Sequence, residues 1–339
     1  MIAIHAAGAM TPVGLELADT MASLYTRVQL VADLDVLDSD GEPLSGMRIP
    51  FTDELDGPAR ITAMAHAVVD EATLSIEPSE KVPLILCCPE AAEFVQAATD
   101  FPAQLLSEVI AECAIPLDRT RSRIVPHGRA GTLEALGAAL ALLKDPSIPY
   151  CLVGGVDSFI DAGRVEKLVA EDRLITEDTK DGFIAGEAGV MLLLTNRPDD
   201  EAMAVWLAAS AGREEAIRGS DHPITGTGLQ EAMSRALAQA KLPFLSLAGL
   251  AHDFSGEERY FEELLQATSR LATANGMPST EDPGLSVGET GAAAGFLAIA
   301  MQAFLHWKGV HKQPSMAVLS CDGPERGAVV LGPLANREK

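Results

Sequence analysis

The sequence predicts an α/β protein built from two similar halves, and three features point to this fold class. First, short apolar runs of the kind that form buried strands alternate with helical segments along the 339 residues. Second, residues 131–143 and 291–307 are helical segments that are apolar on almost every side, which is typical of helices buried between layers. Third, each follows a glycine-rich loop and precedes a short proline-containing linker and a strand. This repeated order indicates an internal duplication.

The first half contains three apolar runs that we interpret as buried strands, at residues 82–88, 150–155 and 190–194. Its buried helix begins at the glycine-rich loop 126–131. Free backbone N–H groups and a partial positive charge at a helix N-terminus suit a nucleophile or an oxyanion. We therefore expect any nucleophile or oxyanion site of the first half to lie at the start of this helix.

The second half repeats the pattern after the polar, proline-containing stretch at residues 196–200. The predicted halves are 1–196 and 197–339, which form one compact unit about a pseudo-twofold axis. The run 257–263, rich in glutamate, is expected to be the solvated face of its helix. Besides the buried helix, the expected elements are strands at 205–209, 244–251, 316–320 and 327–331 and helices at 228–240 and 257–273.

The composition is that of a globular protein with a strongly acidic surface. Hydrophobic residues make up 47% and charged residues 22%, whereas aromatic residues make up only 4%, so the core must consist of aliphatic side chains. The 25 basic and 49 acidic residues give a net charge of −24. Such a surface repels phosphate backbones and anionic lipid headgroups, so we expect neither nucleic acid nor a membrane as a partner.

Nothing in the sequence resembles a targeting or membrane-spanning segment. The N-terminus has no basic stretch before an apolar run, and residues 291–307 are interrupted by Gln302 and His306. The five cysteines are odd in number and form no CxxC pair, which argues against a zinc site and against a secreted disulfide framework. We therefore expect a cytoplasmic protein without a metal.

Four segments resemble the thiolase superfamily and, within it, the β-ketoacyl synthases. Residues 8–14 resemble the opening strand and turn of a ketosynthase, and residues 152–158 resemble the strand after its nucleophile helix. Residues 181–189 are similar to the stretch that leads into the last strand of the first half, and residues 288–295 resemble the Gly-His-x-x-Gly-Ala-x-Gly loop. The resemblance implies a thiolase-like fold, in which two duplicated α/β halves form a layered α-β-α-β-α sandwich.

The resemblance also implies where a ketosynthase site would lie, and most of its positions hold other residues. The family uses a cysteine at the tip of the first buried helix to take up an acyl group, and two histidines, or a histidine and an asparagine, assist decarboxylation and condensation. Gly128 stands at the cysteine position, Glu289 at the second histidine, and only His252 matches. The family's lysine, glutamate and C-terminal glycine loop fall on Gly284, Ala298 and residues 321–324.

Each of the three candidate site residues keeps two interpretations. His252 is either a residual general base or an inert, hydrogen-bonded residue at a strand end. Glu289 either caps a helix N-terminus or acts as an acid or base. Cys321 either packs in the core or, in a loop that loosely resembles the thiolase Cys-x-Gly-Gly-Gly loop, forms a reactive pair with His252. The basic cluster Arg119, Arg121, Arg123 and Arg129 either forms salt bridges or anchors an acidic partner or a dimer.

The resemblance implies two functions from different classes. The first is a degenerate ketosynthase that does not catalyse and serves as a scaffold or accessory subunit, like a chain-length factor or an accessory component of type VI secretion. It would form a homodimer or a heterodimer with a related subunit, through residues 122–125, and would bind a carrier protein or a secretion effector. The alternative is an acyltransferase of the 3-oxoacyl-carrier-protein synthase type that uses His252 with Cys321 or Glu289. We expect no cofactor, although an acyl-CoA or acyl-carrier-protein thioester could be a ligand.

Overall fold

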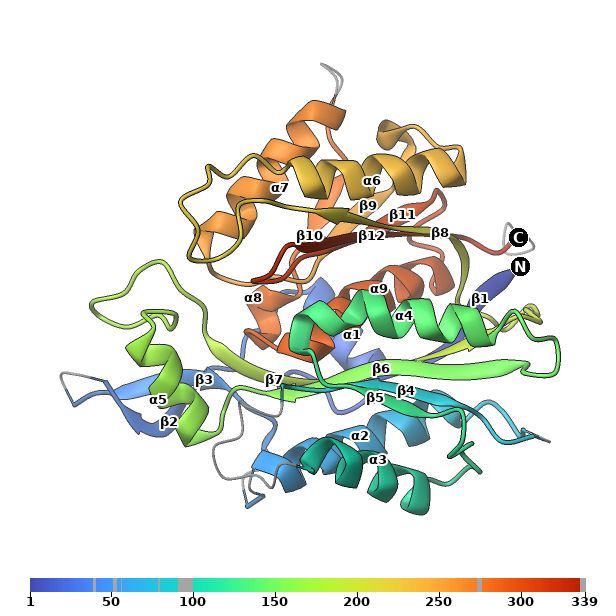
Figure 1. Ribbon diagram of the computed structural model, residues 1–339, viewed down its shortest axis with the longest axis horizontal. Helices are drawn as coiled ribbons and strands as arrows, with labels where there is room; N and C mark the ends of the chain where they lie inside the picture. Colours follow the sequence, from blue (N-terminus) through green and yellow to red (C-terminus); the bar gives the residue numbers. More distant parts are fainter. Residues whose placement is uncertain are drawn as a thin grey trace.

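The computed structural model describes residues 1–38, 41–50, 54–55, 57–78, 80–90, 100–272 and 276–335. Five layers follow one another in Figure 1: helices α6 and α7, a sheet, the central helices α4 and α9, a second sheet, and helices α2 and α3. This is the layered α-β-α-β-α arrangement, and it confirms the predicted fold class.

The helices and strands occur in the following order. The first half contains β1 (Ile2–Met10), α1 (Leu17–Tyr25), β2 (Ala32–Leu37), β3 (Pro43–Met47), α2 (Gly57–Thr73), β4 (Leu84–Cys87), α3 (Phe101–Glu112), β5 (Arg123–Val125), the 3₁₀ turn η3 (Gly128–Ala130), α4 (Gly131–Leu142), β6 (Tyr150–Ser158), α5 (Ala162–Ala170) and β7 (Ala185–Thr195). The second contains β8 (Ala204–Arg213), α6 (Thr227–Ala240), η4 (Phe244–Ser246), β9 (Gly249–His252), α7 (Glu258–Leu271), β10 (Ser279–Glu281), α8 (Gly284–Val287), η5 (Gly291–Ala293), α9 (Ala294–Trp307), β11 (Ser315–Leu319) and β12 (Glu325–Gly332).

The two groups of strands have the same connectivity. The hydrogen-bonded order is β5-β4-β6-β7-β1 in one group and β10-β9-β11-β12-β8 in the other. In both, the edge strand is parallel to its neighbour and the last two strands are antiparallel. Strand β1 also pairs with β8 over Ile2–Ile4, so the two groups join into one continuous sheet among the described strands. The division between residues 196 and 197 stays a prediction.

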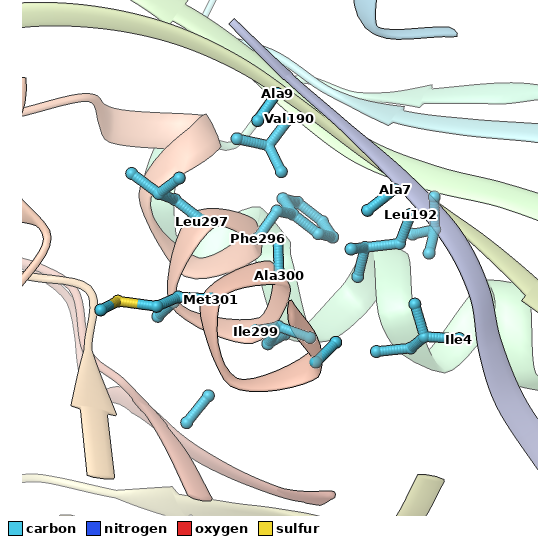
Figure 2. Close-up of a cluster of buried hydrophobic side chains, with 14 of the residues drawn as sticks. Ile4, Ala7, Ala9, Val190, Leu192, Phe296, Leu297, Ile299, Ala300 and Met301 are labelled. Atoms are coloured by element: carbon cyan, nitrogen blue, oxygen red, sulfur yellow. The ribbon is translucent and has the colours of Figure 1, made fainter. Parts of the chain in front are cut away.

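The largest hydrophobic cluster lies between the two groups of strands, around helix α9. Phe296, Leu297 and Met301 of this helix pack in the same cluster as Ile4 of β1 and Leu192 of β7 (Figure 2). Small residues let the backbones approach closely, as at Gly155 of β6, where an added Cβ would lie 2.0 Å from the carbonyl oxygen of Ala292. Strand β6 and the turn η5 before helix α9 are therefore in close backbone contact.

Most predicted elements are present, but two expectations were wrong. Residues 244–246 form the 3₁₀ turn η4 instead of the start of a strand, because Lys241 adopts a left-handed conformation and Pro243 then begins a tight turn. The run 257–263 is not a solvated helix face: Glu257 and Glu263 are buried, with arginine partners. Residue 273, the predicted end of that helix, lies outside the described residues. None of the described helices is both long enough and apolar enough to span a bilayer.

The contact between β6 and η5 gives a test of the central packing. We expect Gly155→Ala to lower the free energy of unfolding by about 1–3 kcal/mol, because the methyl group would overlap the Ala292 backbone. The matched control is Gly137→Ala in helix α4, where an added Cβ meets nothing within 4 Å. The control should stabilise the protein by about 0.5–1 kcal/mol. Chemical denaturation of both variants measures the difference, and equal stability would contradict the close packing.

Candidate functional site

The loop before helix α4 is anchored to the end of strand β4. The Gly128 N–H donates a hydrogen bond to the Cys88 carbonyl oxygen at 3.0 Å, and the Cys87 thiol donates to the Gly128 carbonyl oxygen at 3.3 Å. Gly128 has φ of +52°, which favours glycine. Its N–H is therefore already paired and is not free to bind an oxyanion.

A cavity of about 300 Å³ opens beside Gly128. A Cβ added to this glycine would meet no atom within 4 Å, so the position faces open space. The lining residues are mostly polar and come from both halves of the chain: Glu90, His127, Gly128, Arg129, Ala130, Asp157, Phe159, Arg164, Lys167, Leu168, Glu171, Arg173, Phe183, Glu289, Gly291, Cys321, Asp322 and Gly323.

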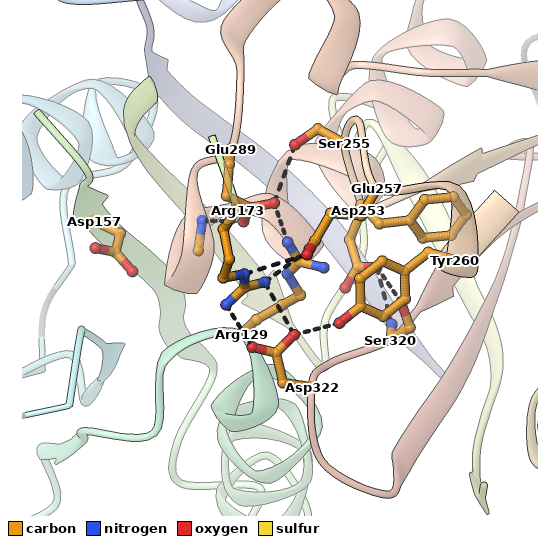
Figure 3. A network of polar contacts seen from close by, with 12 residues as sticks. Arg129, Asp157, Arg173, Asp253, Ser255, Glu257, Tyr260, Glu289, Ser320 and Asp322 are labelled. Atoms are coloured by element: carbon orange, nitrogen blue, oxygen red, sulfur yellow. Dashed lines mark hydrogen bonds and ion pairs between the residues drawn. The ribbon is translucent and has the colours of Figure 1, made fainter. Parts of the chain in front are cut away.

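Arg129 and Glu289 form a buried ion pair across the two halves (Figure 3). Their side chains are 9% and 2% exposed. Glu289 also accepts hydrogen bonds from the Gly291 N–H at 2.8 Å and from the Ser255 hydroxyl at 3.0 Å. One carboxylate oxygen of Glu289 thus accepts the Gly291 N–H at the start of the helical segment, as the capping interpretation expects. The other oxygen binds Arg129 and Ser255.

A second, partly exposed cluster surrounds Arg173, which lines the same cavity (Figure 3). Arg173 binds Glu257 at 2.7 Å and Asp322 at 2.8 Å, and the Tyr260 hydroxyl donates to Asp322. Burial by itself would raise the pKa of Asp322, but the positive charges of Arg173 and Arg129 outweigh it, so the pKa is lowered. Asp322 is therefore an anion at neutral pH.

A third ion pair joins Asp157 at the end of β6 to Arg164 of α5. Arg164 Nη1 lies 2.6 Å from Asp157 Oδ1, and both side chains are almost fully buried. Asp157 also accepts hydrogen bonds from the N–H groups of Ser158 and Ala292, each at 2.8 Å. The Arg164 guanidinium lies 3.9 Å from the centroid of the Phe159 ring, which fixes its orientation.

His252 is not among the residues that line the large cavity. Its Nδ1 lies 3.2 Å from the Phe254 carbonyl oxygen, which can only accept, so this nitrogen carries the proton. The ring stacks on Phe254 with centroids 4.0 Å apart. Burial lowers the pKa of His252 to about 4, so the ring is neutral at pH 7. It lines a separate space of about 10 Å³ next to Gly284 and Val287, which is too small for a substrate.

The cysteines near this region are protonated thiols. Cys321 lines the large cavity and donates to the Glu325 carbonyl oxygen at 3.4 Å. Burial raises its pKa to about 11, and burial also raises the pKa of Cys87 well above its usual value. A thiol in this state is a poor nucleophile. The expected proximity of Cys321 and His252 does not produce a contact, because the two residues line different spaces.

Of the predicted site residues, Gly128, Glu289 and Cys321 line one cavity and His252 lines another. Arg129 separates from the rest of the predicted basic cluster, which is exposed on the surface. Arg119, Arg121 and Arg123 contact Ser107, Asp118 and Glu134, respectively. No three His, Cys, Asp or Glu side chains in the described part of the chain are arranged to hold a metal ion.

Sequence reasoning missed several charged residues of this region, and Asp253 is the clearest example. It is buried beside His252, and its Oδ1 accepts the Ser320 N–H at 2.9 Å. Burial raises the pKa of Asp253 to about 7. The sequence did contain a signal, because Asp253 stands where the ketosynthase motif has a glycine after the histidine. Arg164 and Arg173 carried no such signal, because only the fold brings their helix and loop to the cavity.

Comparisons with known proteins agree with this architecture. No family model and no curated protein sequence matches the chain. Among solved structures, it is similar to a chain of "AntDE:AntF (apo): type II PKS acyl-carrier protein in complex with its ketosynthase bound to the hexaketide", with a TM-score of 0.80, 13% identity and coverage of 98% and 99% of the two chains. It is also similar to the ishigamide ketosynthase/chain length factor, with a TM-score of 0.74, 14% identity and the same coverage.

A third similar structure is an oxazolomycin ketosynthase domain of Streptomyces albus JA3453, with a TM-score of 0.74 and 14% identity, over 100% of this chain and 76% of that chain. Identities this low show the fold alone. The chain therefore has the thiolase-like α/β fold found in ketosynthases and in a ketosynthase/chain-length-factor complex.

Proposed function

We propose that this protein is a degenerate ketosynthase that does not condense acyl groups and acts by binding, as a scaffold or accessory subunit. The observation that carries the proposal is the state of the α4 tip. Gly128 has no side chain to hold an acyl group, and its N–H is bonded to Cys88. Loss of a nucleophile typically lowers an enzyme's rate by roughly a million-fold, and loss of an oxyanion donor by roughly a hundred- to a thousandfold.

The surroundings of Gly128 support the same proposal. Ketosynthase chemistry needs an imidazole beside the thioester, but His252 lines a different and much smaller space. Arg129 and Glu289 instead place a buried ion pair near the tip, and Glu289 falls at the second histidine position of the family. Charged walls also disfavour an acyl chain, since apolar groups would displace water from ions without replacing its hydrogen bonds.

We further propose that the protein works in a dimer, either with itself or with a related subunit. In the thiolase superfamily, the strand before the nucleophile helix commonly pairs with its counterpart in a second subunit. Here that strand is β5, which lies at one end of the strand order and pairs only with β4 among the described strands. One similar structure is a ketosynthase/chain length factor, and another contains an acyl-carrier protein. A carrier protein and a type VI secretion effector are the two partner classes we consider.

One observation favours a second candidate, an acyltransferase that works without a thiol at position 128. Cys321 and Glu289 both line the cavity next to Gly128. A thioester bound there would meet a thiol and a carboxylate. The high pKa of Cys321 and the pairing of Glu289 with Arg129 weigh against this candidate.

A thioester assay separates the two functions. We expect the purified protein, incubated with acyl-CoA thioesters of different chain lengths, to release no free CoA and to gain no acyl mass, because no activated nucleophile faces the cavity. Free thiol release and intact mass spectrometry are the measurements. Turnover that is lost in His252→Ala, Cys321→Ser or Glu289→Gln, while Arg119→Ala keeps it, would establish the acyltransferase instead.

The proposed dimer interface predicts slow hydrogen exchange at one edge of the sheet. Strands β5 and β10 both lie at an end of the strand order, and each spans three residues. We expect the amides of β5 to exchange more slowly than those of β10, because a second subunit would pair with β5. Exchange monitored by mass spectrometry gives the comparison, together with the mass from light scattering. A monomer, or equally fast exchange in both strands, would contradict this interface.

The scaffold proposal also predicts a stable partner in the native cell. Tagged protein should co-purify with a partner in a fixed ratio, and mass spectrometry should identify it. A carrier protein or ketosynthase would indicate a role like that of a chain-length factor, whereas a secretion effector would indicate a type VI accessory. Recovery of the chain alone as a monomer would contradict the scaffold role.

A further inference from the structure

An apolar groove lies between helix α1 and the C-terminal part of helix α9. It consists of two adjoining hollows of about 170 and 540 Å³, and Phe304 of α9 lines both of them. The smaller hollow lies beside Ala22 and Tyr25 of α1. The larger one lies beside Ala18 of α1 and Trp307 of α9. The two helices thus form the opposite walls of one groove.

Large apolar side chains are exposed along this groove. Tyr25 and Val310 of the smaller hollow are 61% and 52% exposed, and Leu74 and Trp307 of the larger hollow are 83% and 38% exposed. The chain has only two tryptophans and three tyrosines, and one of each is exposed here. Exposed apolar patches mark interaction sites, and tryptophan and tyrosine are enriched in them. The groove therefore has the character of a protein docking surface.

The spacing of the two hollows matches the repeat of a helix. Leu17 and Ala18 of α1 line the larger hollow, and Met21 and Ala22, four residues further along the same helix face, line the smaller one. Four residues of a helix span about 6 Å. Two apolar side chains one turn apart on a partner helix have the same separation, so each can enter one hollow.

The charges at the groove differ between its two ends. Among the described residues of the larger hollow, Glu71, Asp200 and Glu201 carry carboxyl groups and none is Lys or Arg. Asp200 and Glu201 are exposed. At the smaller hollow, Lys308 holds its Nζ 3.7 Å from the centroid of the Trp307 ring. A partner segment that carries a positive charge at one end of its apolar stripe is complementary to this arrangement.

We propose that this groove binds an amphipathic helix of a partner protein, with two apolar side chains in the hollows and a basic side chain beside Asp200 and Glu201. A second copy of this chain, with its net charge of −24, or an anionic lipid surface suits the groove less, because each brings further negative charge to these carboxylates. Neither hollow shares a lining residue with β5 or with the cavity beside Gly128. The inference therefore goes beyond the proposed function.

Two synthetic peptides of about 18 residues, long enough to form a helix, test the proposal. Both have leucines on one helix face and alanine and glutamine on the other. One carries two lysines in its last turn, and the other carries two glutamates there. Fluorescence anisotropy of the labelled peptides measures the Kd. We expect the lysine peptide to bind about fivefold more tightly than the glutamate peptide or better, because only its charges oppose those of the larger hollow.

Filling the hollows should weaken this binding. Ala18→Gln and Ala22→Gln place a larger, uncharged side chain at the larger and the smaller hollow, respectively. Each should raise the Kd of the lysine peptide by about fivefold or more. The control is Ala238→Gln, because Ala238 is also an exposed helical alanine, in α6, and lies outside both hollows. Glutamine is a good helix former, so all three variants keep their helices.

The basic end of the partner helix is tested by removing charges from the protein. Asp200→Asn combined with Glu201→Gln should reduce the preference for the lysine peptide by about twofold to fivefold, as expected for exposed ion pairs. Glu258→Gln combined with Glu262→Gln removes two exposed carboxylates of α7 outside the groove. This control has the same net charge and should keep the preference.

Several results would overturn the inference. They are the absence of binding by both peptides, an equal loss of affinity in Ala238→Gln, and an unchanged preference after Asp200 and Glu201 are neutralised. Dissociation of a dimer in Ala22→Gln, seen by light scattering, would identify a second copy as the occupant instead. None of these results bears on the thioester assay or on hydrogen exchange in β5, so failure of this inference and failure of the proposed function are distinguishable.

Discussion

The ion pair between Arg129 and Glu289 is the contact on which the centre of the molecule depends. It joins the start of helix α4 to the loop before helix α9, and so links the two halves at the tips of their buried helices. Removing one member of a buried pair typically costs about 3–5 kcal/mol, because the other charge is left without a partner. The pair therefore fixes the relative position of the two helix tips.

Two features of the chain determine the surroundings of Gly128 and the position of His252. Cys88 and Cys87, at the end of β4, bind the N–H and the carbonyl oxygen of Gly128, respectively, and so anchor the loop before helix α4. The stacking of His252 on Phe254 and its bond to the Phe254 carbonyl hold the imidazole in another space. The chain thus combines the fold with a polar cavity at Gly128 and an imidazole that lines a separate space.

The alternation of strands with buried helices could be predicted from the sequence because apolar periodicity and small-residue loops are local signals, whereas the order of the layers came from the resemblance to ketosynthases. The helix near residues 294–307 is apolar on almost all sides, and this pattern indicates that it is buried. The buried arginine network could not be predicted in this way. Glu257 and Glu263 lie in a charged run that is typical of an exposed helix face, and only the arginines from distant loops and strands, such as Arg173 and Arg326, explain their burial. The orientation of the His252 ring also depends on its stacking on Phe254, which a sequence motif does not predict.

Because the N–H of Gly128 is already bonded to Cys88, a reactive side chain at this position would not by itself build a catalytic site. A glycine can become a cysteine through one substitution, and the open space in front of it would accept the new sulfur. That thiol would nevertheless be separated from His252, which lines a different space, and the N–H of its own residue would already be bonded to Cys88. One substitution at this position would therefore supply a sulfur and leave the position of His252 unchanged.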